Sequence, residues 1–259
     1  YEGKLPPPKS KLQENWEERE QLLFRSTNFG DDVDRALKKA DGEWTYFAPD
    51  VAYHFDKISR GYQVIIDVFG ADHAGYVKRM KSAVSALSDG LITLEVKLCQ
   101  LVKLFKNGVP YKMSKRAGNF VLLKDVVNEV GPEIARFVML MRKNDAPLDF
   151  DFNKALEQSK DNPVYYVQYA HARSNSILVK ARKEGLAENF DYISSEQFSN
   201  LSKSEEKDLI KMIAMWPRTI EVSAKKREPH RVAFYLYELA ACFHALQHIG
   251  KVNSEFRFI

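Results

Sequence analysis

A basic run near the middle of the chain has the residue types that could do chemistry. Residues 112–119 read KMSKRAGN, so Lys112, Ser114 and Lys115 flank Met113 and lead into small residues. Ammonium and backbone N–H groups in such a loop can hold the oxygens of a triphosphate and stabilise charge that moves during phosphoryl or adenylyl transfer. The alternative is a solvated basic turn, because short motifs rich in lysine and arginine often match by chance.

The bulk composition is that of an ordinary globular protein. The 259 residues are 45% hydrophobic and 29% charged, which suffices for one large or two ordinary domains. A net charge of +4 is compatible with nucleic acid without indicating it. Two cysteines cannot build a disulfide framework or a four-cysteine zinc site, and no apolar run reaches the ~20 residues of a membrane span. We therefore expect a cytoplasmic protein without a membrane partner. We also expect a monomer, although the composition does not indicate the oligomeric state.

The elements before and around the basic run are those of an α/β region. Residues 1–30 carry no clear pattern and are expected to be irregular. Val64–Phe69 is a near-continuous apolar run, which predicts a parallel strand buried on both faces. A helical spacing from Val77 to Leu87 follows, and residues 94–98 alternate like a second strand. Asn107-Gly108 then predicts a hairpin that leads into the basic run.

The turn between the first strand and its helix is a candidate nucleotide site. Ligands of open α/β sheets bind at the carboxyl ends of strands, where Gly70, Asp72 and His73 lie. A glycine lets a sugar ring approach the backbone, and a carboxylate can accept the protons of both ribose hydroxyls. The alternative for Asp72 is a helix N-cap.

A phenol and a carboxylate four residues apart form a second candidate. Tyr46 and Asp50 together could grip a guanidinium, because its fork of N–H donors fits a carboxylate in bidentate fashion. The residues alone favour a buried tyrosine and a helix N-cap.

The second half of the sequence reads as helical. Gly131-Pro132, Asn162-Pro163 and Glu228-Pro229 each begin a helix, and the run from Ser202 to Glu205 resembles a capping box. Because nothing strand-like follows Phe150, we place a domain boundary there, giving domains of residues 1–149 and 150–259.

One helix of the second half could contact RNA. Tyr166, Tyr169 and Arg173 share a helical face, and aromatic and guanidinium groups can stack on unpaired bases. A tyrosine-rich seam between helices is the alternative. His244 and His248 stand four residues apart without a third ligand nearby, and we expect no protein metal site.

Longer blocks make a family resemblance specific. KMSKR is similar to the second hallmark of class I aminoacyl-tRNA synthetases, and residues 112–152 resemble a bacterial arginyl-tRNA synthetase. Four further blocks fit the same family in the same order: LFRSTNFGDDVDR at 23–35, DGEWTYFAPDVAYH at 41–54, FGADHAGY at 69–76 and NPVYYVQYAHARSNSI at 162–177. The resemblance covers essentially the whole chain.

The resemblance implies a fold and a reaction. The fold would be the α/β remainder of a class I Rossmann-type catalytic domain, residues 1–149, followed by an all-α anticodon-binding bundle, residues 150–259. The reaction would activate L-arginine with ATP and Mg²⁺ to arginyl-adenylate, generally in the presence of tRNA, and then esterify tRNA-Arg.

The resemblance also implies residue roles. Lys112, Ser114 and Lys115 would act in catalysis on the phosphates, with Lys115 steadying the charge that develops on pyrophosphate. The other implied contacts are with ATP by Gly70, Asp72, His73 and Met113, with arginine by Tyr46 and Asp50, and with the anticodon by Tyr166, Tyr169, Arg173 and Phe243.

The sequence also departs from the family pattern. The first class I hallmark and the family's last helix are not found, so we expect a carboxy-terminal portion of a longer protein that is truncated at its end as well. That portion alone should not catalyse arginine-dependent ATP–pyrophosphate exchange. At Gln247, many relatives carry an aromatic residue. The rival interpretations are a tRNA-binding fragment or paralogue without catalysis, and an adenylyltransferase with another product.

Overall fold

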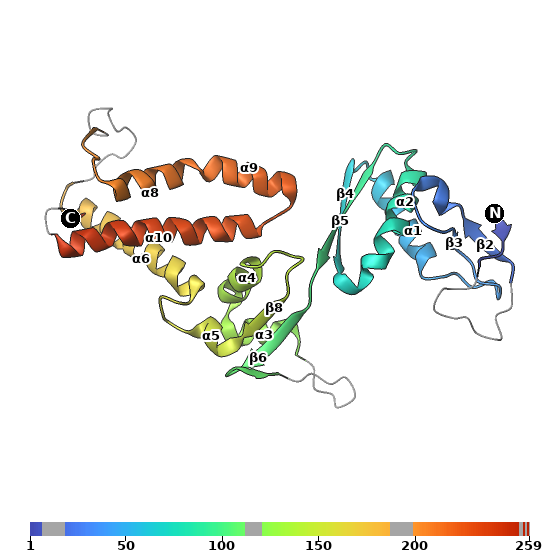
Figure 1. Ribbon diagram of the computed structural model, residues 1–259, viewed down its shortest axis with the longest axis horizontal. Helices are drawn as coiled ribbons and strands as arrows, with labels where there is room; N and C mark the ends of the chain where they lie inside the picture. Colours follow the sequence, from blue (N-terminus) through green and yellow to red (C-terminus); the bar gives the residue numbers. More distant parts are fainter. Residues whose placement is uncertain (7–18, 112–120, 187–198, 254–255, 257, 259) are drawn as a thin grey trace. The chain divides into compact units, whose positions relative to one another are not determined.

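The computed structural model describes residues 1–6, 19–111, 121–186, 199–253, 256 and 258 (Figure 1). These form two compact units, Tyr1–Leu101 and Val102–Ile259. No helix in the described ranges is long and apolar enough to cross a membrane.

The first unit is built around a parallel pair of strands with a helix between them. The pair registers Val64 with Thr93 and Gly70 with Cys99. In chain order, the elements of the unit are β1 (Glu2–Gly3), β2 (Gln21–Phe24), η1 (Ser26–Phe29), β3 (Arg35–Ala36), α1 (Phe47–Ser59), β4 (Val64–Gly70), η2 (Ala71–Tyr76), α2 (Val77–Leu87) and β5 (Thr93–Cys99).

The core of the first unit lies on one face of this strand pair. Ile65 of β4 and Leu94 of β5 pack against Phe47 of α1 and Met80 of α2. The opposite face of β4 is exposed: Val68, for example, is 68% accessible. The predicted strand and helix are therefore confirmed, but burial of the strand on both faces is wrong, because the described helices of this unit cover one face only.

The first thirty residues are more ordered than the sequence suggests. β1, β2 and β3 form a small antiparallel sheet. Its connecting loop is closed by Asp31, whose carboxylate receives two 2.7 Å hydrogen bonds from the Arg35 guanidinium. This bidentate contact lowers the pKa of Asp31. The expectation of an irregular segment is therefore wrong for its described part.

The second unit opens with the predicted hairpin. Asn107 and Gly108 both have positive φ, 53° and 74°, as a type I′ turn requires. They join β6 (Val102–Lys106) to β7 (Val109–Pro110), and β6 also pairs in parallel with β8 (Leu148–Asp151). Under this sheet, Phe150 is fully buried among side chains of α3 (Leu123–Val130), α4 (Pro132–Leu140) and α5 (Phe152–Leu156).

A bundle of longer helices follows (Figure 1). The elements are α6 (Pro163–Lys183), α8 (Ser204–Ala214), α9 (Trp216–Lys226) and α10 (His230–Val252), and α10 packs against each of the other three. Asn162 caps α6 by accepting a hydrogen bond from the Val164 backbone N–H, as predicted. The capping box predicted at Ser202–Glu205 is shifted by one residue, since the Glu206 carboxylate accepts a hydrogen bond from the Lys203 backbone N–H.

A mixed α/β region followed by a helical bundle is therefore confirmed. The boundary predicted between residues 149 and 150 falls inside β8, within the second unit, whereas the compact units divide after Leu101. The assignment of 1–149 and 150–259 to separate domains stays a prediction.

Candidate functional site

The amino end of α1 and the segment η2 meet through one strong hydrogen bond. The phenol of Tyr76 donates to Oδ2 of Asp50 at 2.6 Å. Asp50 lies exposed in the first turn of α1, so its carboxylate is accessible to a ligand. It caps no helix: the N-cap residue is Tyr46, whose side chain makes no capping bond and is 94% exposed. The two predicted arginine-binding residues thus stand at one helix end, with one of them oriented by Tyr76.

The predicted ribose-binding turn follows β4 directly. Gly70 has an extended backbone that any residue could adopt, so glycine is not required here for its φ angle. Its lack of a side chain instead leaves room above the backbone. A Cβ built on Gly70 would lie 2.5 Å from Oδ1 of Asp72, which shows that the carboxylate folds back over the glycine. Asp72 is exposed and caps no helix, and the His73 imidazole lies 3.7 Å from its carboxylate. Gly70, Asp72 and His73 therefore form one accessible group, in the same unit as Asp50.

A buried polar cluster lies behind Asp50 and was not singled out from the sequence. His54 of α1 contacts Oδ2 of Asp67 on β4 at 2.8 Å through Nε2, and both residues are buried. Lys57 donates to the other oxygen of Asp67 at 3.0 Å. The second ring nitrogen of His54 lies 2.8 Å from the carbonyl oxygen of Asp50. A charged residue inside an apolar strand, as Asp67 is in VIIDVF, is the sequence signal that could have revealed this cluster.

Aromatic rings line the seam between α6 and α10 in the second unit. Tyr166 packs against Tyr237 and against His244, whose Nε2 lies 3.1 Å from the Tyr166 carbonyl oxygen. Burial in this seam raises the pKa of Tyr166. Tyr169 is 39% exposed, with its ring stacked on those of Tyr165 and His244. Tyr166 therefore fits the interhelical alternative best, and Tyr169 offers a face to a ligand.

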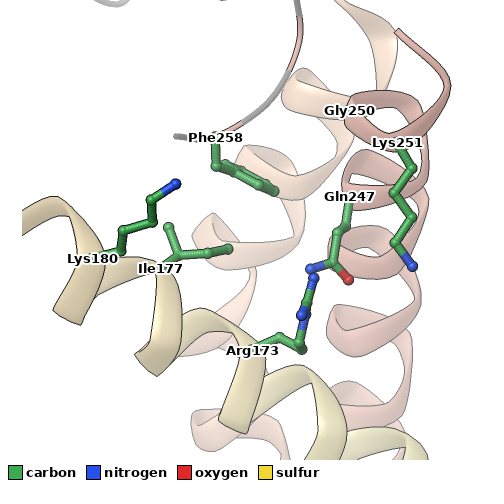
Figure 2. Close-up of a pocket in the computed structure, with 7 residues that line it drawn as sticks. All are labelled: Arg173, Ile177, Lys180, Gln247, Gly250, Lys251 and Phe258. Atoms are coloured by element: carbon green, nitrogen blue, oxygen red, sulfur yellow. The ribbon is translucent and has the colours of Figure 1, made fainter. Parts of the chain in front are cut away.

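Arg173 completes this surface one turn further along α6. Its Nε and one Nη lie 2.8 and 3.0 Å from the side-chain amide of Gln247, whose oxygen faces them once the amide is oriented to accept (Figure 2). Gln247 is buried, and its amide oxygen accepts both hydrogen bonds, which holds the guanidinium in place. Phe243, on the same helix as Gln247, stacks on Phe258 at 5.9 Å between ring centroids.

A pocket of about 300 Å³ opens between α6 and α10 beside this pair (Figure 2). It combines three cationic side chains with apolar ones, and its lining residues are Arg173, Ile177, Lys180, Gln247, Gly250, Lys251 and Phe258. Cations beside an aromatic ring suit the phosphate and base of an unpaired nucleotide. The predicted catalytic residues Lys112, Ser114 and Lys115, with Met113, lie outside the described residues.

Comparisons with known proteins agree with both halves of this description. Residues 167–256 match the DALR anticodon binding domain family. Curated arginine–tRNA ligases from Ruegeria pomeroyi and Roseobacter denitrificans are each 62% identical over all 259 residues. The chain spans 45% of the length of each of these relatives.

Solved structures give the same result. A structure from Campylobacter jejuni, assigned to the arginyl-tRNA synthetases, aligns with a TM-score of 0.71 and 35% identity over 88% of this chain and 49% of its own. The Thermus thermophilus arginyl-tRNA synthetase, at 19% identity, shares the fold with a TM-score of 0.66 over 86% of this chain and 45% of its own. In sequence and in fold, the chain matches the carboxy-terminal portion of bacterial arginyl-tRNA synthetases.

Proposed function

We propose that the protein is an arginine–tRNA ligase. It would activate L-arginine with ATP to arginyl-adenylate and transfer the arginyl group to the 3′ end of tRNA-Arg in the cytoplasm, acting as a monomer. The observation that carries this proposal is the 62% identity to curated arginine–tRNA ligases over the whole chain. Mg²⁺ would accompany the ATP phosphates, as in other adenylyl and phosphoryl transfers.

The residues of the first unit supply chemistry that suits the proposed substrates. Asp50 presents an accessible carboxylate to the guanidinium of arginine, with Tyr46 at the same helix end. Gly70 leaves room for a ribose, Asp72 would accept its hydroxyl protons, and His73 would contact the nucleotide. Each residue binds or orients a substrate here, while the basic run at 112–116 would supply the charge that acts on the phosphates.

Charging assays on the protein at its natural full length test the proposal directly. Incubation with ATP, tRNA-Arg and each amino acid in turn should give arginyl-tRNA and no other product. Binding of tRNA without charging would favour the rival interpretation of a paralogue without catalysis. Adenylation without any transfer to tRNA would favour an adenylyltransferase with another product.

Replacing Asp50 with asparagine should raise the KM for arginine by about 30-fold, because a charge-assisted bidentate pair becomes a neutral contact. The KM for ATP should hardly change, since Asp50 is proposed to contact the amino acid only. Steady-state charging at varied arginine concentration measures both values. An unchanged arginine KM would remove Asp50 from substrate recognition. Asp56→Asn, on the same helix with a surface ion pair to Arg60, is the matched control.

Replacing Arg173 with glutamine should weaken tRNA-Arg binding by about tenfold, the typical cost of losing a guanidinium that contacts a base. If Arg173 reads a base, the loss should be larger for tRNA-Arg than for a tRNA with another anticodon. If it contacts only phosphate, both should weaken equally and the salt dependence should become shallower. Filter binding at several salt concentrations separates these cases. Lys207→Gln on the exposed side of α8 is the control, and equal affinity of both variants would remove Arg173 from the interface.

A further inference from the structure

Asp50 is held at two separate points by side chains from other positions of the first unit. The Tyr76 hydroxyl donates to its carboxylate at 2.6 Å. The Nδ1 atom of His54 lies 2.8 Å from its backbone carbonyl oxygen. Because a carbonyl oxygen can only accept, Nδ1 of His54 is the donor in this contact. One residue thus has both its side chain and its main chain fixed, although it lies in an exposed first turn of a helix.

The histidine that holds the main chain is itself anchored in the interior. Its Nε2 meets the buried carboxylate of Asp67 on β4, at a side-chain exposure of 5% for His54 and 7% for Asp67. Lys57 satisfies the second oxygen of Asp67 at 3.0 Å, and its ammonium lies 4.5 Å from the ring centre of Tyr53. Buried charges are expensive unless they are paired and hydrogen-bonded, so this cluster has one well-defined arrangement. It ties the first turn of α1 rigidly to the parallel strand.

The tyrosine that holds the carboxylate is also fixed. Its ring makes edge contacts with Phe47 and Phe69, and the guanidinium of Arg79 lies 4.9 Å above it. Partial burial and the hydrogen bond to Asp50 raise the pKa of Tyr76, so the phenol keeps its proton at neutral pH. It therefore remains a donor and cannot repel the carboxylate.

We propose that Tyr76 and His54 are positioning residues that set the carboxylate of Asp50 for one orientation of a guanidinium. The inference rests on the proposed role of Asp50 in binding arginine. The Tyr76 hydroxyl occupies one lone pair of Oδ2. Both lone pairs of Oδ1 and one of Oδ2 remain for the two N–H groups of the ligand's guanidinium. Without this hydrogen bond, the exposed side chain of Asp50 would populate several rotamers, and binding would have to select one of them. Preorganisation of this kind lowers the cost of ordering when the ligand binds.

Kinetics of Tyr76→Phe on the protein at its natural full length test the first half of the proposal. The ring contacts stay and only the hydrogen bond is lost, so the arginine KM should rise by about five- to tenfold while the ATP KM is unchanged. In an Asp50→Asn background, Tyr76→Phe should have no further effect on the arginine KM, because it acts through Asp50. Tyr62→Phe, at an exposed position of the same unit, is the control for loss of a phenol.

The outcomes separate this inference from the proposed function. If Asp50→Asn leaves the arginine KM unchanged, the proposed role of Asp50 fails, and the positioning role fails with it. If Asp50→Asn raises the KM but Tyr76→Phe does not, positioning alone is overturned. If Tyr76→Phe raises the KM for arginine and ATP alike, Tyr76 is merely structural.

Two substitutions at His54 test its two hydrogen bonds separately. An asparagine amide can reach the position of Nδ1 and keep the contact with the Asp50 carbonyl, whereas a glutamine amide reaches that of Nε2 and keeps the contact with Asp67. We therefore expect His54→Asn to keep the arginine KM within about twofold and His54→Gln to raise it by about fivefold. Melting temperatures of both variants control for loss of folding. The reverse order of KM values, or equal values in two folded variants, would overturn the role of His54.

Discussion

Replacing Lys115 with alanine is expected to lower the rate of arginyl-adenylate formation by about two orders of magnitude or more, with only a modest change in tRNA affinity. As the triphosphate is cleaved, negative charge grows on the departing pyrophosphate. An ammonium group placed there is worth more in the transition state than in the bound substrate, so its loss appears in the rate constant. The prediction rests on the sequence of the basic run and on the family resemblance.

The measurement is ATP–pyrophosphate exchange with arginine and tRNA-Arg present, on the protein at its natural full length, beside a direct tRNA-binding assay. Lys124→Ala supplies the matched control, because Lys124 is an exposed lysine of α3 outside the basic run. A normal exchange rate for Lys115→Ala would remove this residue from the mechanism. A loss of tRNA binding as large as the loss of rate would instead assign it to RNA recognition.

Features set by neighbouring residues are predictable from the sequence. The turn at Asn107-Gly108 needs two positive φ angles, and few residue pairs tolerate both. The start of α6 at Asn162-Pro163 is marked by an acceptor side chain at the N-cap and a proline at the first helical position, and these two residues are adjacent in the sequence. The parallel strand β4 also follows from its local apolar pattern.

Contacts between distant positions are not predictable in this way. Tyr76 lies 26 residues from Asp50, and Gln247 lies 74 residues from Arg173, so no local pattern pairs them. The exposed face of β4 is a related case. Its apolar residues predict a strand buried on both faces, but they do not show whether another element covers the second face. Candidate residues could thus be named from the sequence, while the side chains that orient them could not.

These orienting contacts also bear on the choice between an enzyme and a binding module. An RNA-binding remnant would use the surface of α6 and α10, but it has no need for an exposed aspartate whose carboxylate and main-chain carbonyl are both hydrogen-bonded by other side chains of the first unit. Polar residues in buried positions cost stability unless their partners are kept, as the His54–Asp67 contact is. The first unit therefore carries features that favour the catalytic interpretation over the binding one.

Replacing Phe150 with alanine should lower the free energy of unfolding of the second unit by about 3–5 kcal/mol, which is the usual cost of a large cavity in a packed core. Phe150 has no exposed surface and meets Phe152 edge to face at 5.4 Å, under the sheet that joins β6 to β8. Phe150→Leu should cost less, because it keeps much of the buried volume. Phe234→Ala, at a position that is 42% exposed, should cost well under half as much as Phe150→Ala.

Chemical denaturation measures this loss and at the same time tests the predicted boundary at residues 149/150. Trp216 of α9 packs against Tyr235 and reports on the helical bundle by fluorescence once Trp16 and Trp44 are replaced with phenylalanine. If the boundary lies at 149/150, Phe150 belongs to the same domain as the bundle, so Phe150→Ala should shift the Trp216 transition and leave the part of the far-UV circular dichroism transition that comes from residues 1–149 nearly in place. A Trp216 transition left in place would mean that Phe150 unfolds with the residues before it and that the bundle domain begins after residue 150, whereas a common shift of both signals would mean that it begins before residue 150. A loss below about 1 kcal/mol would contradict the central place of Phe150 in this core.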